Sequence, residues 1–137
     1  MSGVAGVLVA VAACSVVTQS QERGLTEGVY SDTQATRGRR VYRQACSSCH
    51  ARNLEGGEMG PGLLGRPFIA PWEGESLAEL MAYMQETMPQ DNPGGLNEQD
   101  YSDVLAYVLK VNEFPSGDVD LTAASVESIV IEIELSK

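Results

Sequence analysis

The chain has 137 residues and a formal net charge of −10, with 19 acidic and 9 basic side chains. This length suits a single small domain, and the acidic balance excludes an extended basic surface for nucleic acid while favouring solubility or a basic partner. Three cysteines, two of them only three residues apart, exclude a framework of disulfide bonds.

The first residues read as a targeting segment. Residues 1–13 contain no charged side chain and form an apolar run too short to span a bilayer, so we expect a signal peptide there. Ala10-x-Ala12 suits an ordinary signal peptidase, whereas the four residues that end at Cys14 resemble a bacterial lipoprotein signal and would explain the third cysteine. No Lys or Arg precedes the run, which argues against a lipoprotein signal. A disordered apolar terminus without a role in export is the alternative.

Polar residues follow and lead into the first expected helix. Residues 14–33 have no sustained period and predict a flexible tether. Residues 34–45 contain good helix formers and predict a helix with Gly38 and Tyr42 on one face. Five of the nine basic side chains lie in sixteen residues that contain no acid: Arg37, Arg39, Arg40, Arg43 and Arg52. We interpret this basic collar either as a docking surface or as a solvated helix face.

The collar surrounds the motif Cys46-x-x-Cys49-His50. Two thiols separated by two residues and followed by histidine form the attachment signature of haem c. One helical turn places both sulfurs along one edge of the porphyrin, where they add to its two vinyl groups, and His50 then faces the iron. A thioredoxin-like dithiol would need a βαβ context, and a zinc site would need ligands beyond the single histidine. A chance match without haem is the remaining alternative.

A loop and a second helix come after the motif. Residues 53–65 hold five glycines and one proline and predict an irregular loop. Ser76 and Glu79 form a capping box at the start of an apolar stripe with helical spacing. The helix should end at Met88-Pro89, because the residue before a proline is biased away from the helical conformation.

A third helix completes the expected domain. Asn97 with Asp100 marks its start, and it should end near Asn112. Residues 116–137 begin with a polar turn and end in alternating apolar and acidic side chains, which predicts a short strand within a C-terminal strap or tail. We therefore expect an all-α domain over residues 34–115, with three main helices wrapped around one covalently bound haem.

The sixth iron ligand separates electron carriage from the binding of gases or peroxide. Met81 and Met84 lie on a helix face, where methionines usually fill the core. Met59 lies nine residues after His50, whereas Met88 leaves the helix into an extended backbone 38 residues after His50, which gives the chain room to wrap the haem. We predict Met88 as the sixth ligand, with Met59 as the alternative. Histidine and methionine ligation leaves no open position and suits outer-sphere electron transfer.

The region from 34 to 115 resembles the small single-haem cytochromes c of the mitochondrial and bacterial type. The matching motifs are Gly38-x-x-x-Tyr42, Cys46-x-x-Cys49-His50, Gly60-Pro61-Gly62-Leu63 with Gly65, Trp72, Met88-Pro89 and Leu105-Ala106-Tyr107-Val108. The resemblance implies the cytochrome c fold and close crossing of the first and last helices, with Gly38 and Tyr42 against Tyr107. It also implies that the Pro61 carbonyl accepts the ring N–H of His50 and so orients the iron ligand.

The same resemblance extends to groups around the haem. Trp72 and Arg66 resemble side chains that hydrogen-bond the haem propionates, with core packing as the alternative for Trp72 and a solvated side chain for Arg66. A finer resemblance to bacterial cytochromes that serve periplasmic quinoprotein dehydrogenases rests on Gly56-Gly57, Phe68, Trp72-Glu73-Gly74 and Asn112-x-Phe114-Pro115. The chain differs from the mitochondrial proteins in having only two lysines, so docking would use the arginine collar or apolar contacts.

These features predict an electron carrier and not an enzyme, because no catalytic acid, base or nucleophile is needed. The expected partners are a periplasmic dehydrogenase, of the quinoprotein class in the finer resemblance, and a terminal oxidase or another cytochrome. We expect a periplasmic location, no nucleic acid, and a membrane contact only through a lipid at Cys14. The alternatives are a haem sensor or enzyme with an open site, and a subunit of a larger dehydrogenase in which residues 121–135 wrap the partner.

Overall fold

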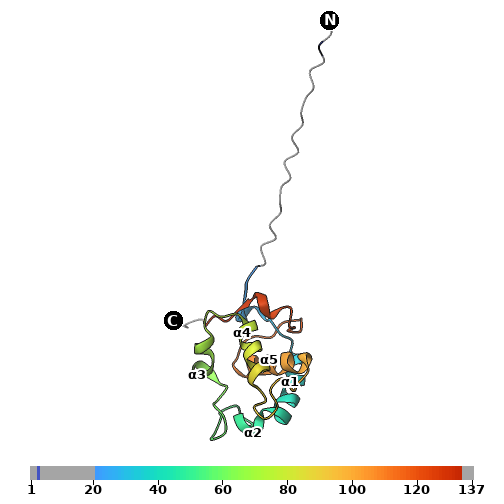
Figure 1. Cartoon of the computed structure of the whole chain (residues 1–137). Coiled ribbons are helices and arrows are strands. Elements are labelled where there is room, and N and C mark those ends of the chain that lie inside the picture. The colour runs from blue at the N-terminus through green and yellow to red at the C-terminus, as the bar shows by residue number, and fades with distance from the viewer. Residues whose placement is uncertain (1–2, 4–20, 134–137) are drawn as a thin grey trace.

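The computed structural model describes residue 3 and residues 21–133 (Figure 1). The signal peptide expected over residues 1–13 and the lipid expected at Cys14 therefore lie outside the described residues, apart from Gly3. Within the described ranges, no helix is both long enough and apolar enough to cross a membrane.

Three long helices carry the domain: α1 Asp32–Ala45, α4 Leu77–Thr87 and α5 Glu98–Val111. Each begins at a polar side chain that accepts a hydrogen bond from a backbone N–H three residues later; the capping residues are Ser31, Ser76 and Asn97. The first helix starts two residues earlier than predicted, because Ser31 supplies its cap. The other two start where the sequence predicts, so the expectation of three main helices is confirmed.

Shorter elements join the long helices. They are α2 Ser47–His50, α3 Gly65–Ile69, the 3₁₀ turns η1 Leu25–Glu27, η2 Ala70–Trp72 and η3 Val126–Ser128, and the strands β1 Arg23–Gly24 and β2 Ile129–Val130. The two strands pair in parallel, with Arg23 opposite Ile129 and Gly24 opposite Val130. The helical turn expected at the cysteine motif is α2. A short strand is present in the C-terminal segment, but β2 ends at Val130, before the alternating residues on which the prediction rests. The other short elements produce no hydrophobic period, so the sequence does not predict them.

The first and last long helices cross in close contact. A Cβ added at Gly38 of α1 would lie 1.7 Å from the backbone oxygen of Asp103 in α5, so only glycine fits at the crossing. One turn further along α1, the rings of Tyr42 and Tyr107 lie 5.4 Å apart between centroids. Next to Gly38, Arg37 of α1 donates two hydrogen bonds to the buried carboxylate of Asp103 in α5. This is the crossing that the resemblance implies for Gly38, Tyr42 and Tyr107.

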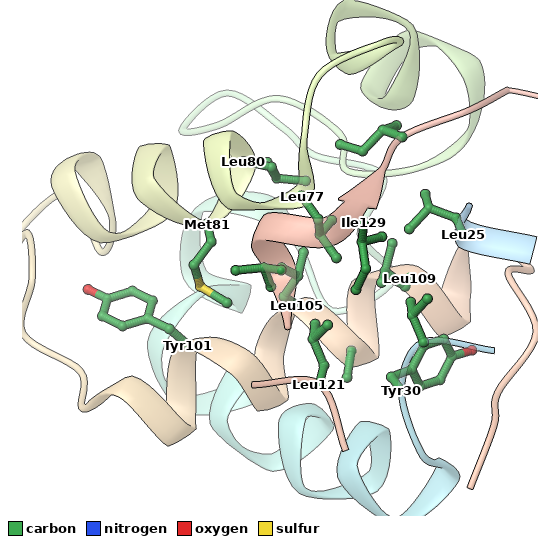
Figure 2. Packing of buried hydrophobic residues seen from close by; sticks show 14 of the residues in the cluster. Leu25, Tyr30, Leu77, Leu80, Met81, Tyr101, Leu105, Leu109, Leu121 and Ile129 are labelled. Carbon is green, nitrogen blue, oxygen red and sulfur yellow. The ribbon is translucent and has the colours of Figure 1, made fainter. Parts of the chain in front are cut away.

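The tether expected over residues 14–33 is wrong for the described part of that segment. Leu25 and Tyr30 are buried, with 0% and 1% of their surface exposed, and Figure 2 shows them in one cluster with side chains of α4 and α5. Buried Gln34 accepts from the backbone N–H of Leu121 and donates to its carbonyl, both at 2.7 Å. The Tyr30 hydroxyl likewise donates to the carbonyl of Phe114, 84 residues away. Contacts with such distant partners leave no local pattern, which explains why the composition of residues 14–33 suggests a tether.

The C-terminal segment lies on its own domain as a strap. Four of its apolar side chains are buried in the helical core: Leu121, Val126, Ile129 and Ile131. The backbone of Ile131 also exchanges hydrogen bonds of 2.9 Å with Gly74 and Glu75, just before α4. These side chains already face their own core, so they do not form an apolar surface for wrapping a partner.

Candidate functional site

The cysteine motif sits at a break between two helices. α1 ends at Ala45, where the backbone N–H of Cys46 donates to Tyr42 at 2.9 Å, and the single turn α2 follows. Within that turn, the backbone N–H of His50 donates to the Cys46 carbonyl at 3.0 Å. Cys46 and Cys49 are half-buried and His50 is buried, so one turn of helix holds both thiols and the imidazole on the inside of the domain.

The ring of His50 has a fixed partner on one side. Its Nδ1 lies 2.8 Å from the carbonyl oxygen of Pro61, which can only accept, so Nδ1 carries the proton and donates. Nε2 is then the unprotonated nitrogen and is available as a ligand. The hydrogen bond that the resemblance implies between His50 and Pro61 is present.

The glycine-rich loop is folded tightly around this contact. Gly56 has a φ of +79°, and a Cβ there would lie 2.4 Å from the backbone nitrogen of Gly62. The backbone N–H of Gly56 donates to the His50 carbonyl at 3.0 Å, and the N–H of Leu63 donates to Leu54 at 2.7 Å. Close backbone approach of this kind holds Pro61 against the histidine ring.

Most of the predicted site residues line one cavity of about 830 Å³, which we call the central cavity. They are Cys46, Cys49, His50, Pro61, Trp72 and Met88. Apolar side chains from α3, α4 and α5 form much of its wall, including Phe68, Leu80, Val104, Leu105 and Val108. The lining of the central cavity has few polar groups, and its volume lies within the range of ligand pockets. Both features indicate a site for a large, mainly apolar cofactor.

Three methionines line the central cavity, and the fourth described methionine lies elsewhere. Met81 is buried in the core between α4 and α5, as its place on the helix face predicts. Met88 leaves α4 in an extended conformation, with φ −127° and ψ 149°, and its carbonyl accepts from Tyr101 at 2.6 Å. Met59 is 70% exposed at the edge of the cavity, and Met84 lies one turn before Met88.

The two residues expected at the haem propionates, Trp72 and Arg66, differ in their position relative to the central cavity. Trp72 lines the central cavity, and its ring meets Tyr83 edge-on with 5.5 Å between centroids. Arg66 is exposed on α3 and is not among the residues that line the cavity. The structure therefore does not place Arg66 at this site. Tyr83, which lines the rim beside Trp72, is a site residue that the sequence analysis did not single out.

The electrostatics of Cys46 argue against its acting as the attacking thiol of a disulfide oxidoreductase. Burial, together with the neighbouring Cys49, raises the pKa of Cys46 to about 11. A thiol with this pKa stays protonated at neutral pH, whereas the attacking thiol of a disulfide oxidoreductase needs a lowered pKa. Across residues 21–133, no three Cys, His, Asp or Glu side chains gather as a structural zinc site requires.

The residues around the central cavity fit a covalently bound haem. The thiols of Cys46 and Cys49 and the imidazole of His50, held by Pro61, line the cavity from one short stretch of the chain. The thioether of Met88 lines it from a separate segment. Residues 33–108, more than half of the chain, match the family model described as cytochrome c oxidase, cbb3-type, subunit III. The chain belongs to this family of c-type cytochromes. Its cofactor is therefore haem c, and Cys46-x-x-Cys49-His50 is the motif that covalent attachment uses.

A solved structure supports the fold of this cytochrome. The sulfane dehydrogenase SoxCD from Paracoccus pantotrophus superposes with a TM-score of 0.59 and 20% identity, over 89% of this chain and 66% of the other. This likeness shows the fold alone, and the cytochrome spans just under two thirds of the chain it matches. The prediction of an all-α cytochrome c fold is confirmed. A comparison with curated protein sequences finds no match.

Proposed function

We propose that this cytochrome carries single electrons outside the cytoplasm, from a periplasmic dehydrogenase to a terminal oxidase or another cytochrome. The observation that carries the proposal is that His50, held by Pro61, and Met88, at the end of α4, line the same apolar cavity. Haem c held by a nitrogen and a thioether changes its oxidation state by one electron and has no open position for a substrate.

The residues of the chain hold and orient this group. Cys46 and Cys49 bind it covalently, and the proton on Nδ1 of His50 stays in the hydrogen bond to Pro61. That bond keeps Nε2 directed away from the loop and raises its basicity as a ligand. The apolar wall excludes water, which favours transfer of an electron without bond formation.

Met88 is the sixth ligand in this proposal. Its backbone is held by the hydrogen bond from Tyr101, so the chain after α4 has a fixed position beside the cavity. Met84 remains part of α4 and packs against the core, and Met59 is largely exposed. Trp72 is proposed as the partner of a haem propionate, because it is the predicted propionate group that lines the cavity.

The location and the anchor are part of the same proposal. The apolar run of residues 1–13 supports export, and the sequence around Cys14 supports a lipid anchor. The acidic excess supports a soluble domain that meets charged partners.

Visible spectra of the haem-loaded protein, with and without carbon monoxide, test the closed site. We expect low-spin bands that carbon monoxide does not change in the wild type, in Met84→Leu and in Met59→Leu. Met88→Leu should become high-spin and bind carbon monoxide, because leucine cannot ligate iron. A wild type that binds carbon monoxide readily would instead indicate a sensor or an enzyme.

A fixed subunit of a dehydrogenase complex is the second candidate. The observation in its favour is the fold that the chain shares with the dehydrogenase SoxCD. Gel filtration of the native extract separates the two: a free carrier elutes at the size of one small domain, and a subunit elutes with a larger protein.

A further inference from the structure

The arginines of the basic collar differ in what they contact. Arg37 binds the carboxylates of Asp103 and Asp120 and so belongs to the packing between α1, α5 and the strap. Among the described residues, no acidic side chain forms an ion pair with Arg39, Arg43 or Arg52. The collar therefore consists of one structural arginine and a group of uncompensated cations.

The uncompensated cations surround a second cavity, of about 330 Å³, that we call the basic hollow. Its lining comprises Arg39, Arg43, Arg52, Lys110, Tyr107 and three small or apolar side chains. Lys110 also pairs with Asp32 at 2.5 Å, but no acidic side chain is part of the lining. A protein with a net charge of −10 thus has a concave surface lined by four cations.

The fold alone does not account for this arrangement. Arg39 and Arg43 are one turn apart on the exposed side of α1, and like charges at this spacing destabilise a helix. Arg43 gains some compensation from the C-terminal end of the helix dipole, but Arg39 and Arg52 do not. An unfavourable charge cluster at a concave surface indicates a ligand of opposite charge.

We propose that the basic hollow is a docking surface for a protein partner whose surface presents two or more carboxylates. The inference rests on the proposed role as an electron carrier, and it names the chemistry of one partner. Guanidinium groups bind carboxylates in a two-pronged geometry. The cations come from α1, α5 and the residues after α2, so they suit spaced carboxylates of a protein surface better than one compact anion.

The position of the basic hollow suits electron exchange. Tyr107 lines the hollow, Tyr42 lines the central cavity, and their rings are in contact at 5.4 Å between centroids. A partner seated in the hollow would therefore lie one aromatic pair away from the haem site. Acidic surface elsewhere on the molecule repels an acidic partner and so directs it to this face.

A binding measurement with a hexaglutamate peptide tests the proposal. In the reduced haem-loaded protein at low salt, the peptide should shift the NMR signals of Arg39, Arg43, Arg52 and Tyr107. Each of Arg39→Gln and Arg52→Gln should weaken binding by about two- to fivefold, as expected for exposed ion pairs. The triple variant Arg39→Gln/Arg43→Gln/Arg52→Gln should weaken it by about tenfold or more.

Arg40→Gln is the matched control, because Arg40 is exposed on α1 and does not line the hollow. Binding that Arg40→Gln weakens as much as Arg39→Gln would reflect overall charge and overturn the proposal. Tighter binding of inorganic pyrophosphate at the same residues would make the hollow a small-anion site and also overturn it. Visible spectra recorded on the same samples distinguish this proposal from the proposed electron carrier. If the peptide does not bind but the spectrum is low-spin and unchanged by carbon monoxide, only the docking surface is contradicted.

Discussion

The two ends of the domain bury their apolar side chains in different ways. At the end formed by the strap, Leu25, Tyr30, Leu121 and Ile129 bury one another together with α4 and α5. At the end formed by α2 and the glycine-rich loop, apolar side chains line a cavity of about 830 Å³. Figure 1 shows the strap, coloured red, at one end of the domain and α2 at the other. Protein side chains alone fill the core at the strap end, whereas at the α2 end the haem fills the space between the apolar side chains.

The size of the central cavity indicates how strongly the second end depends on the cofactor. Apolar side chains of α3, α4 and α5 form much of the wall of this 830 Å³ cavity, so without a cofactor they would contact water, at about 25 cal/mol per Å² of apolar surface left uncovered. The haem is therefore part of the hydrophobic core as well as the redox group.

Removing both attachment points should have the largest effect. In Cys46→Ser/Cys49→Ser produced without haem, we expect no cooperative unfolding transition of the haem end. Hydrogen exchange should show lost protection in α4 and in residues 53–65, because these segments line the cavity. Ser47→Ala/Ser48→Ala keeps both thiols and should unfold like the wild type. A doubly substituted chain that melts cooperatively at the wild-type temperature would show that both ends fold without the cofactor.

Widening the helix crossing should have the next largest effect, because both ends rest on α1 and α5. Gly38→Ala would place a Cβ 1.7 Å from the Asp103 oxygen and force the helices apart. We expect the free energy of unfolding in urea to fall by about 3 kcal/mol or more. Gly57→Ala is the control, because an added Cβ there meets nothing within 4 Å. Equal stability of the two variants would contradict the crossing.

A substitution confined to the strap end should change stability without changing the redox group. Gln34→Leu leaves the buried backbone N–H and carbonyl of Leu121 without their partners, which should cost about 1–3 kcal/mol in the free energy of unfolding. The reduction potential should stay at the wild-type value, because the contact lies away from the central cavity. Exposed Gln21→Leu should leave both quantities unchanged. A large shift in potential for Gln34→Leu would show that the two ends are coupled.

Acid should weaken the strap end slightly. Hydrogen bonds from Ser31 and Arg37 hold the pKa of Asp120 below its usual range. Its contribution is therefore present above about pH 4, the usual pKa of an unfolded aspartate, and is lost as pH falls through the lower folded-state value. Because Asp120 is 40% exposed, we expect less than about 1 kcal/mol.

Urea unfolding at pH 7 and pH 3 measures this contribution. Asp120→Asn should lose less stability on acidification than the wild type, whereas the exposed neighbour variant Asp118→Asn should behave like the wild type. The same acid response in all three proteins would show that Asp120 does not hold the strap.

Sequence reasoning succeeds where structure depends on near neighbours. The caps at Ser76 and Asn97 and the haem motif are local patterns, and the His50–Pro61 contact spans only eleven residues. The strap end depends on pairs such as Gln34 and Leu121, 87 residues apart, which leave no periodic pattern in either segment.

The charged residues show the same limit. The sequence places the arginine collar around the motif but does not separate Arg37, which binds Asp103 across 66 residues, from the cations of the basic hollow. For Arg66 the resemblance leaves a propionate partner and a solvated side chain open, and the structure shows an exposed side chain that is not among the residues lining the central cavity.

A potentiometric titration of the haem-loaded protein, with and without carbon monoxide, tests the central claim most directly. A closed carrier ligated by His50 and Met88 predicts one reversible one-electron transition whose midpoint carbon monoxide does not change. Carbon monoxide binds reduced iron, so an open position would raise the midpoint through linkage. A raised midpoint in the wild type would contradict the electron carrier proposed here.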